Sequence, residues 1–573
     1  MNNSLFILAI FWGVWIIIPV FFDGLLTIVY MSVIFFKGGH KRPKRHPVPD
    51  NLPLVSIIIP TYNEEENINE CLNYLKIQTY PHEKMEIIVV DNGSKDRTSE
   101  IVKEHMKDTW ENRNQLKENG KPPISYNRFP SSNNNGKIKV NGQSYQASAF
   151  GGVLRLLIRP EKGKASALNT GIKLSQGEII INIDCRSFLA PEAIYKMVAK
   201  FIESPEYGAA TGNIEIDWNL VYERDSLGNY LLGGDGCLKP RELSHKEKFL
   251  GKSQFLEYLT SFRLGRQFQD ITGSMYTFSG AFSAFRREVL LKSSLYQSRT
   301  VAEDTDLTLN LQGQNVRLGF AEEAKAFLKP VISFEKFYAQ RIRWHRGQIE
   351  VIGLHLDWYG NFRQSFWRAF WHSVLLMIDH TFAFPRLIWM FLLPLFFLFG
   401  YSMNLITKAI ILMYAFYVFM DFLNACFCNW VADKETRAKI KETIQYALVT
   451  PIFRLLTFFF RLAAYLDVLE EAQAWSTPYN IIRSMKAYRE KVRGGYQKTA
   501  GLGAQIWQFL TGKKGEGAVY YDENIAELDD FGLGREETGA DKIAPALEVK
   551  GGFDRQRKEG KMDGITLRKN PKS

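Results

Sequence analysis

The stretch 177–191, GEIIINIDCRSFLAP, constrains the fold of this chain more than any other stretch. Its run 179–183, apolar apart from Asn182, is short and rich in isoleucine, which predicts a strand buried on both faces, as in a parallel sheet. Asp184 ends the run, Arg186 follows two residues later, and Pro191 suits the first turn of a helix. A carboxylate at the end of a central strand lies where open α/β sheets bind ligands. A loop aspartate that caps the next turn is the equally good alternative.

Short apolar runs alternate with helical patterns from Leu54 onward. The runs 55–59, 86–90 and 153–158 predict strands, and 64–78 and 95–106 predict helices. This alternation predicts an α/β domain over 54–330 with a parallel sheet and right-handed crossovers. Two polar stretches, near 105–150 and 218–252, predict insertions with little core.

Apolar residues gather at two places outside this domain, within 1–36 and 371–470. The first, followed by a basic linker over 37–53, predicts a retained transmembrane helix whose basic end is cytoplasmic. The runs 384–401 and 406–431 are long enough to span, whereas 443–469 contains Arg454 and Asp467 and either spans or lies at the interface. The polar tail 471–573 is predicted to be partly disordered.

The net charge of +11 is typical of proteins that meet nucleic acid or an anionic membrane, and the apolar segments favour the membrane. Five scattered cysteines lack zinc-type pairing and a disulfide pattern, which fits a reducing compartment for the middle region.

Seven short motifs follow one another along the chain. They are IIIPTYNEEENI (57–68), VVDNGSKDRT (89–98), KGKASALNTGI (162–172), IDCRS (183–187), SGAFSAFRREVL (279–290), AEDTDLTLNL (302–311) and QRIRW (340–344). Each motif is weak alone. Together, over 54–344, they resemble the membrane-embedded, processive-type, inverting glycosyltransferases of family two, the group of cellulose, chitin, hyaluronan and poly-N-acetylglucosamine synthases. The resemblance implies the type A glycosyltransferase fold, a nucleotide-binding α/β sheet, together with α-helical transmembrane segments.

By this resemblance, the donor site lies at the ends of the first strands. Pro60, Tyr62 and Glu64 would shape the nucleotide pocket. Asp91 would accept hydrogen bonds from uracil or ribose, because a carboxylate accepts two donors in a fixed plane. Lys164 would approach the diphosphate. The alternatives are an ordinary Asx turn for Asp91 and a solvated surface position for Lys164.

The family's catalytic base is the aspartate of a Glu-Asp pair, which corresponds to Asp304, with Glu303 beside it. Glycosyl transfer needs an acceptor hydroxyl deprotonated as it attacks the anomeric carbon, and a stabilised diphosphate leaving group. Asp306 adds a third acid, and repulsion among the three predicts a raised pKa for at least one of them. A helix N-terminus whose acids suit its dipole is the alternative.

In QRIRW, Gln340, Arg343 and Trp344 are spaced i, i+3, i+4 and share one helical face. The family uses the matching residues for the acceptor and the diphosphate. The helix lies in a basic and aromatic region, 331–370, which is expected to lie along the membrane surface. The other basic residues of the helix would then meet lipid headgroups: Arg341, His345 and Arg346.

One departure from the family lies in IDCRS. Family members carry Asp-x-Asp at this strand end, where both acids handle a divalent metal and the donor phosphates, but here Arg186 replaces the second acid. Asp184 alone can still hold Mg²⁺ or Mn²⁺, since such an ion keeps several waters and also uses substrate phosphates. Arg186 would weaken metal affinity, yet its guanidinium can itself neutralise a diphosphate.

Three functions remain open at this point. The first is hexosyl or N-acetylhexosaminyl transfer from a nucleotide-sugar, a UDP-sugar by resemblance, to an extracellular polysaccharide. The second is transfer of a single sugar to a lipid or protein, and the third is a catalytically silent scaffold that binds nucleotide-sugar. The predicted partners are the donor, a saccharide or lipid-linked acceptor, the bilayer and accessory export proteins, without nucleic acid. The predicted location is the plasma membrane, multi-pass, with a cytoplasmic catalytic domain.

Overall fold

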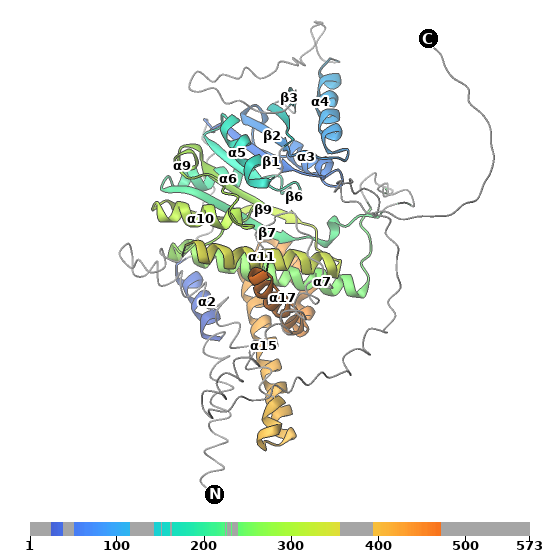
Figure 1. The fold of residues 1–573 in the computed structure, drawn as a ribbon, viewed down its shortest axis with the longest axis vertical. Helices are drawn as coiled ribbons and strands as arrows, with labels where there is room; N and C mark the ends of the chain where they lie inside the picture. The colour runs from blue at the N-terminus through green and yellow to red at the C-terminus, as the bar shows by residue number, and fades with distance from the viewer. Residues whose placement is uncertain are drawn as a thin grey trace, which may run out of the picture. The chain divides into compact units, whose positions relative to one another are not determined.

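A mixed β-sheet with strand order β3-β4-β2-β1-β5-β8-β7-β9-β6 forms the centre of the structure, a computed structural model (Figure 1). It describes residues 24–37, 51–114, 143–149, 152–160, 163–223, 225, 231, 239–355 and 394–470, all within the unit Met1–Arg493. The predicted tail lies outside the described residues. So does much of each of the following: the predicted N-terminal helix, the basic linker and the two insertions. The run 356–393 lies outside them as well.

The parallel sheet predicted from the strand–helix alternation is present as the block β4-β2-β1-β5. β8 pairs antiparallel with β5 and with β7, and each outermost strand pairs antiparallel with its neighbour, so the whole sheet is mixed. The strands are β1 (Val55–Thr61), β2 (Met85–Asp91), β3 (Gln143–Ala149), β4 (Gly152–Ile158), β5 (Ile179–Ile183), β6 (Ser187–Leu189), β7 (Tyr207–Ile216), β8 (Phe282–Arg286) and β9 (Arg317–Leu328).

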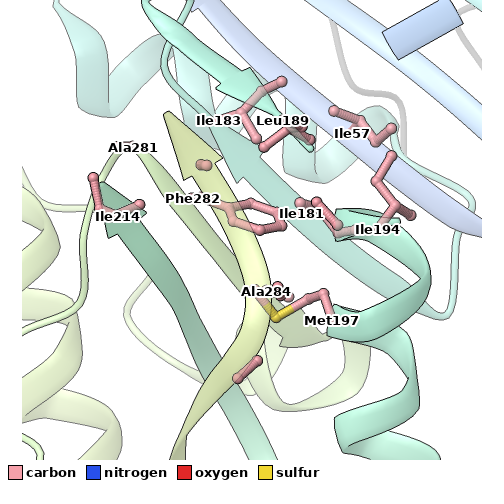
Figure 2. Packing of buried hydrophobic residues seen from close by; sticks show 14 of the residues in the cluster. Ile57, Ile181, Ile183, Leu189, Ile194, Met197, Ile214, Ala281, Phe282 and Ala284 are labelled. Atoms are coloured by element: carbon pink, nitrogen blue, oxygen red, sulfur yellow. The ribbon is translucent and has the colours of Figure 1, made fainter. Parts of the chain in front are cut away.

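The isoleucine-rich run is β5, and all five of its residues are buried. Successive side chains of a strand point to opposite faces, so an apolar run on this pattern needs a core on both sides. Ile181 belongs to one core cluster and Ile180 to another. Figure 2 shows Ile181 beside Phe282 of β8, with Met197 of α6 close by. This double burial fixes the position of the strand end that carries Asp184.

Helices pack against the sheet and against one another. Among them, α5 contacts β1 and β2, and α6 contacts β7 and β9. The helices of the sheet domain are α3 (Ile68–Lys76), α4 (Thr98–Asn114), α5 (Lys164–Leu174), α6 (Ala193–Glu203), α7 (His245–Tyr258), the π-helix η4 (Leu259–Leu264), α8 (Gly265–Thr272), α9 (Arg287–Lys292), α10 (Glu303–Gly313) and α11 (Phe334–Leu354).

Both polar stretches predicted to be insertions contribute regular structure. α4 continues to Asn114, and β3 adds an edge strand paired with β4. An edge strand can be held by backbone hydrogen bonds to a single neighbouring strand and does not need an apolar face. The mostly polar sequence of β3 therefore gave no strand signal. α7 begins inside the second stretch, where Ser244 and Glu247 form a capping box.

Three of the four remaining described α-helices are mostly apolar, and the fourth, KETRAKIKET, is highly charged. The four are α2 (Leu25–Lys37), α15 (Met403–Val431), α16 (Lys434–Thr443) and α17 (Thr450–Glu470). Within the described ranges, α15 is the one helix long and apolar enough by itself to cross a membrane, with 29 residues and a mean hydropathy of 1.8 in its apolar window. The segments Lys434–Leu448 and Thr450–Asp467 pass the same test together, bent by 76°. The predicted run 406–431 falls within α15, and most of the run 384–401 lies outside the described residues.

α17 packs against α11 and lies directly below it in Figure 1. The contact is aromatic: Phe337 and Phe453 have ring centroids 5.4 Å apart, and Tyr338 and Phe460 have centroids 5.0 Å apart. α11 therefore lies between the sheet domain and the C-terminal apolar helices.

Candidate active site

Residues from distant motifs meet around the ammonium group of Lys164, at the start of α5. Its Nζ lies 2.8 Å from Oδ1 of Asp184, at the end of β5, and 3.4 Å from Oε1 of Glu303, at the start of α10. Asp304 is the next residue of α10, and its Oδ2 accepts a hydrogen bond from the backbone N–H of Gly280 at 3.0 Å. We call Lys164, Asp184, Glu303 and Asp304 the acid cluster.

Gly280 is absent from the predicted site residues, although the motif SGAFSAFRREVL contains it. A Cβ atom at this position would lie 3.0 Å from Nζ of Lys164, 3.2 Å from Oδ2 of Asp304 and 3.9 Å from Oδ2 of Asp184. The missing side chain therefore keeps space open over the acid cluster. Its place in the motif was the only sequence signal for this role.

The acid cluster holds three carboxylates against one ammonium group. Burial alone would lower the pKa of Lys164, but the carboxylates of Asp184, Glu303 and Asp304 raise it above the ordinary lysine value, so the ammonium stays charged. Burial raises the pKa of Glu303; Lys164 opposes this rise and Asp304 adds to it. The predicted raised pKa is thus found at Glu303, with burial as its largest cause.

Asp306 does not join the acid cluster in the way its sequence position suggested. It is fully buried, with Nη2 of Arg299 at 2.8 Å and Nε2 of His355 at 2.7 Å from its Oδ1. Burial alone would raise the pKa of Asp306, but hydrogen bonds from these two residues lower it below the ordinary value. The expectation of three mutually repelling acids is wrong here, because Asp306 has hydrogen-bond donors of its own, one of them the guanidinium of Arg299.

Asp91 ends β2 and is buried. Its Oδ1 accepts a hydrogen bond from the backbone N–H of Ser94 at 2.9 Å, and its Oδ2 accepts one from Oγ of Ser99. This is the turn arrangement that the sequence left open as an alternative. Each carboxylate oxygen has a second lone pair, so a contact with a nucleotide stays a prediction. Pro60 and Tyr62 lie half-buried at the end of β1.

Arg186 is paired with Glu64, the residue expected to shape the nucleotide pocket. Nη2 of Arg186 lies 2.7 Å from Oε1 of Glu64, and the two side chains are 70% and 13% exposed. The position of the family's second acid is therefore occupied by a cation that already has a carboxylate partner. The described residues contain no group of three or more His, Cys, Asp or Glu side chains arranged to hold a metal ion. The donor set suits a metal with one protein ligand, Asp184, and not the family's two-acid site.

The three predicted residues of QRIRW lie half-buried on α11. Oε1 of Gln340 is buried and accepts no hydrogen bond from any described residue, so it is an acceptor in need of a donor. Arg343 is close enough to oppose the rise in the pKa of Glu303. Trp344 has ring centroids 6.4 Å from Tyr258 and 6.3 Å from Phe262.

The expectation that the other basic residues of α11 meet lipid headgroups is wrong. Arg341 is 4% exposed and lies 2.6 Å from Oε2 of Glu257. Arg346 is 1% exposed and binds two carboxylates, and His345 is also buried. The two arginines are paired inside the protein with Glu257 and Asp467, acids from other elements that the sequence pattern of one helix does not reveal.

Residues 56–123 and 143–292 match the family described as "Glycosyl transferase family 2", and residues 246–421 match "Glycosyl transferase family group 2". Both matches are to family-two glycosyl transferases. This confirms the predicted family-two resemblance, and with it the predicted enzyme class and the type A glycosyltransferase fold class.

The similar proteins include two relatives named poly-beta-1,6-N-acetyl-D-glucosamine synthase. The Staphylococcus aureus (strain COL) relative is 23% identical over 58% of this chain, and the Staphylococcus epidermidis relative is 22% identical over 61% of it. The chain spans 66% of the length of each relative. A solved structure, a mannosyltransferase from Pyrobaculum calidifontis in complex with GDP-Man and Mn²⁺, is 17% identical, covering 80% of this chain and 99% of its own, with a TM-score of 0.47.

Proposed function

We propose that this protein transfers a sugar from a nucleotide-sugar, a UDP-sugar first of all, to a growing polysaccharide, with inversion at the anomeric carbon. The observation that carries the proposal is the meeting of four sequence motifs around Gly280 in one partly buried cluster of acids and a cation. N-acetylhexosamine is the first donor sugar to test, because two relatives are named for a polymer of N-acetylglucosamine.

In the proposed reaction, Asp304 is the base. As the acceptor hydroxyl attacks the anomeric carbon, its proton passes to the Asp304 carboxylate and the new C–O bond forms. The bond between the anomeric carbon and the phosphate oxygen breaks, and its electron pair leaves with the nucleoside diphosphate. A single displacement of this kind inverts the anomeric configuration. The hydrogen bond from Gly280 holds one oxygen of Asp304 in place.

The diphosphate is proposed to lie beside the cations of the site. Lys164 stays protonated among its carboxylates, Arg343 lies on the helix face next to Glu303, and Arg186 has an exposed guanidinium. Mg²⁺ or Mn²⁺, when bound, would neutralise phosphate charge with Asp184 as its protein ligand. Asp91, Pro60 and Tyr62 are proposed to contact the nucleoside: their strand ends, on β2 and β1, are neighbours in the sheet.

The acceptor is proposed to bind on the QRIRW face of α11. The unpaired acceptor oxygen of Gln340 suits a sugar hydroxyl, and the grouped rings of Trp344, Tyr258 and Phe262 offer flat apolar surfaces to a sugar chain. This aromatic group favours a polymer over a single-sugar acceptor, because it extends the site beyond one hydroxyl.

A membrane location is proposed on the surface of α15. A helix of 29 residues is about 44 Å long at 1.5 Å per residue, enough for a hydrocarbon core of about 30 Å. Only 22% of its apolar window is buried, and Ile411 and Phe419 are among its exposed side chains. We propose a multi-pass plasma-membrane protein with the acid cluster on the cytoplasmic side, where nucleotide-sugars are made.

The proposal is tested by incubating the membrane-reconstituted protein with a panel of radiolabelled nucleotide-sugars, with and without Mg²⁺ or Mn²⁺. A long product supports the polymer, a single added sugar contradicts it, and no product from any donor favours the silent scaffold. Asp304→Asn should abolish transfer, because the amide cannot take the proton, while UDP binding stays within about twofold of wild type. Retained turnover in this variant would contradict the assignment of the base.

A further inference from the structure

The backbone that leads into α10 is held from outside by one residue of α11. Oε2 of Glu350 accepts two hydrogen bonds, from Oγ1 of Thr300 and from the backbone N–H of Val301, both at 3.1 Å. The N–H of Ala302 donates to Oγ1 of Thr300 at 3.2 Å. Ala302 immediately precedes the two acids at the start of α10, so these bonds fix the backbone from which both acids project.

Gly347 brings α11 into direct contact with the same segment. A Cβ atom at Gly347 would lie 2.6 Å from Cβ of Ala302 and 3.2 Å from Cγ2 of Val301, far inside ordinary contact. Gly347 and Glu350 are three residues apart and share one helical face. The glycine therefore permits the close approach, and the glutamate fastens it.

A buried arginine ties this contact to the C-terminal helix α17. Arg346 is 1% exposed; its Nε donates to Oε1 of Glu350 at 2.8 Å, and its Nη1 donates to Oδ2 of Asp467 at 3.0 Å. A guanidinium with five donors in a rigid fork can hold two carboxylates at a fixed separation. Asp467 belongs to α17, so the contacts run from α17 through Arg346 and Glu350 to residues 300–302.

We infer that Glu350, Gly347 and Arg346 are positioning residues for the catalytic base. They hold segment 300–302, and with it Asp304, at a fixed distance from the QRIRW face of the same helix. The inference rests on the proposed function, because it takes Asp304 as the base. One rigid helix, α11, would then fix the positions of the catalytic base and of the residues that contact the diphosphate and the acceptor. The reacting groups are thereby kept at a fixed separation.

The test uses the purified full chain and compares Gly347→Ala and Glu350→Gln with wild type. In Gly347→Ala, the two Cβ atoms must separate by about 1 Å to reach ordinary contact, and a misplacement of that size lowers kcat by about 10²-fold. Glu350→Gln keeps the size of the side chain but turns an amide N–H₂ towards Arg346 or towards Thr300, so a fall in kcat of at least about tenfold is expected. Glu335→Gln, an exposed glutamate in the first turn of α11, is the matched control and should keep wild-type kcat.

Two further readouts separate positioning from general damage. UDP titration should give affinities within about twofold of wild type for both variants, because neither substitution changes a residue proposed to contact the nucleoside or the diphosphate. Adding Ala302→Gly to Gly347→Ala removes the closest clashing atom and leaves contacts of 3.1 and 3.2 Å, so kcat should recover about tenfold or more.

Three results would overturn the inference: wild-type kcat in Gly347→Ala and Glu350→Gln, loss of UDP binding together with activity, or no recovery in the double variant. Asp304→Asn, measured in parallel, identifies which proposal has failed. If Asp304→Asn retains activity, the base assignment is wrong. If it is inactive while the α11 variants turn over normally, only the positioning role is wrong.

Discussion

Replacing Gly280 by alanine should separate catalysis from stability in this protein. The new methyl group would enter the space over the acid cluster, 3.0 Å from Nζ of Lys164 and 3.2 Å from Oδ2 of Asp304. Both neighbours are the ends of side chains, so they can move aside without disturbing the backbone. Gly280 is not among the glycines with positive φ, so alanine fits its backbone conformation.

We expect Gly280→Ala to lower kcat and to raise the free energy of unfolding. Reaching ordinary contact at 3.4 Å or more requires shifts of a few tenths of an ångström in Lys164 and Asp304. A 1 Å misplacement lowers the rate about 10²-fold, so kcat should fall by roughly three- to tenfold. Alanine also restricts the unfolded chain, which should raise the free energy of unfolding by about 0.4–1 kcal/mol.

The assay is sugar transfer under saturating donor, paired with thermal unfolding of the same preparation. Gly265→Ala is a matched control: its added Cβ would meet nothing closer than 3.5 Å, so kcat should not change. Wild-type kcat in Gly280→Ala would refute the reasoning. A fall in the free energy of unfolding that is as large as the fall in kcat, when both are expressed in kcal/mol, would refute it too.

Two further predictions concern charges around the site. Arg186→Asp restores the family's second acid and removes the partner of Glu64. Sugar transfer by this variant should therefore depend more strongly on added Mn²⁺ than transfer by Arg186→Gln. An equal response to Mn²⁺ in both variants would mean that Arg186 lies away from the phosphates. His355 and Arg299 lower the pKa of Asp306, so its ion pairs should stabilise the fold above the ordinary aspartate pKa of about 3.9, and this stability should be lost as the pH falls through the lower folded-state pKa. Asp306→Asn should therefore lower the free energy of unfolding by about 2 kcal/mol at pH 7 and by progressively less as the pH falls below the ordinary aspartate pKa of about 3.9, as measured by thermal unfolding. A difference independent of pH would contradict this assignment.

The elements that the sequence predicted well are those whose signal is local. The four isoleucines of β5 predicted burial on both faces, which the structure has. The motifs at its end and at the start of α10 placed Asp184 and Asp304 in one candidate site, and their roles there stay predictions. β3 was missed because an edge strand depends on backbone hydrogen bonds with β4, and its polar side chains carry no period that reports them.

The basic residues of α11 show the limit of reasoning from one helix. A basic and aromatic pattern fits a helix on a membrane surface, and it fits equally a buried helix whose arginines are paired with acids from elsewhere. Arg341 has Glu257, and Arg346 has Asp467 of α17. The structure has the buried helix with paired arginines. The sequence of α11 alone does not indicate this arrangement, because these partners are far away in the chain.

The sequence by itself therefore determined the family resemblance, the strand ends and the residue types of the candidate site. Only the tertiary structure decided which charges meet: Asp306 turns to Arg299 and His355, Arg186 to Glu64, and Lys164 to the acids. The physical reason is that apolar periodicity repeats within a single element, whereas an ion pair depends on the distance between two elements, and folding sets that distance.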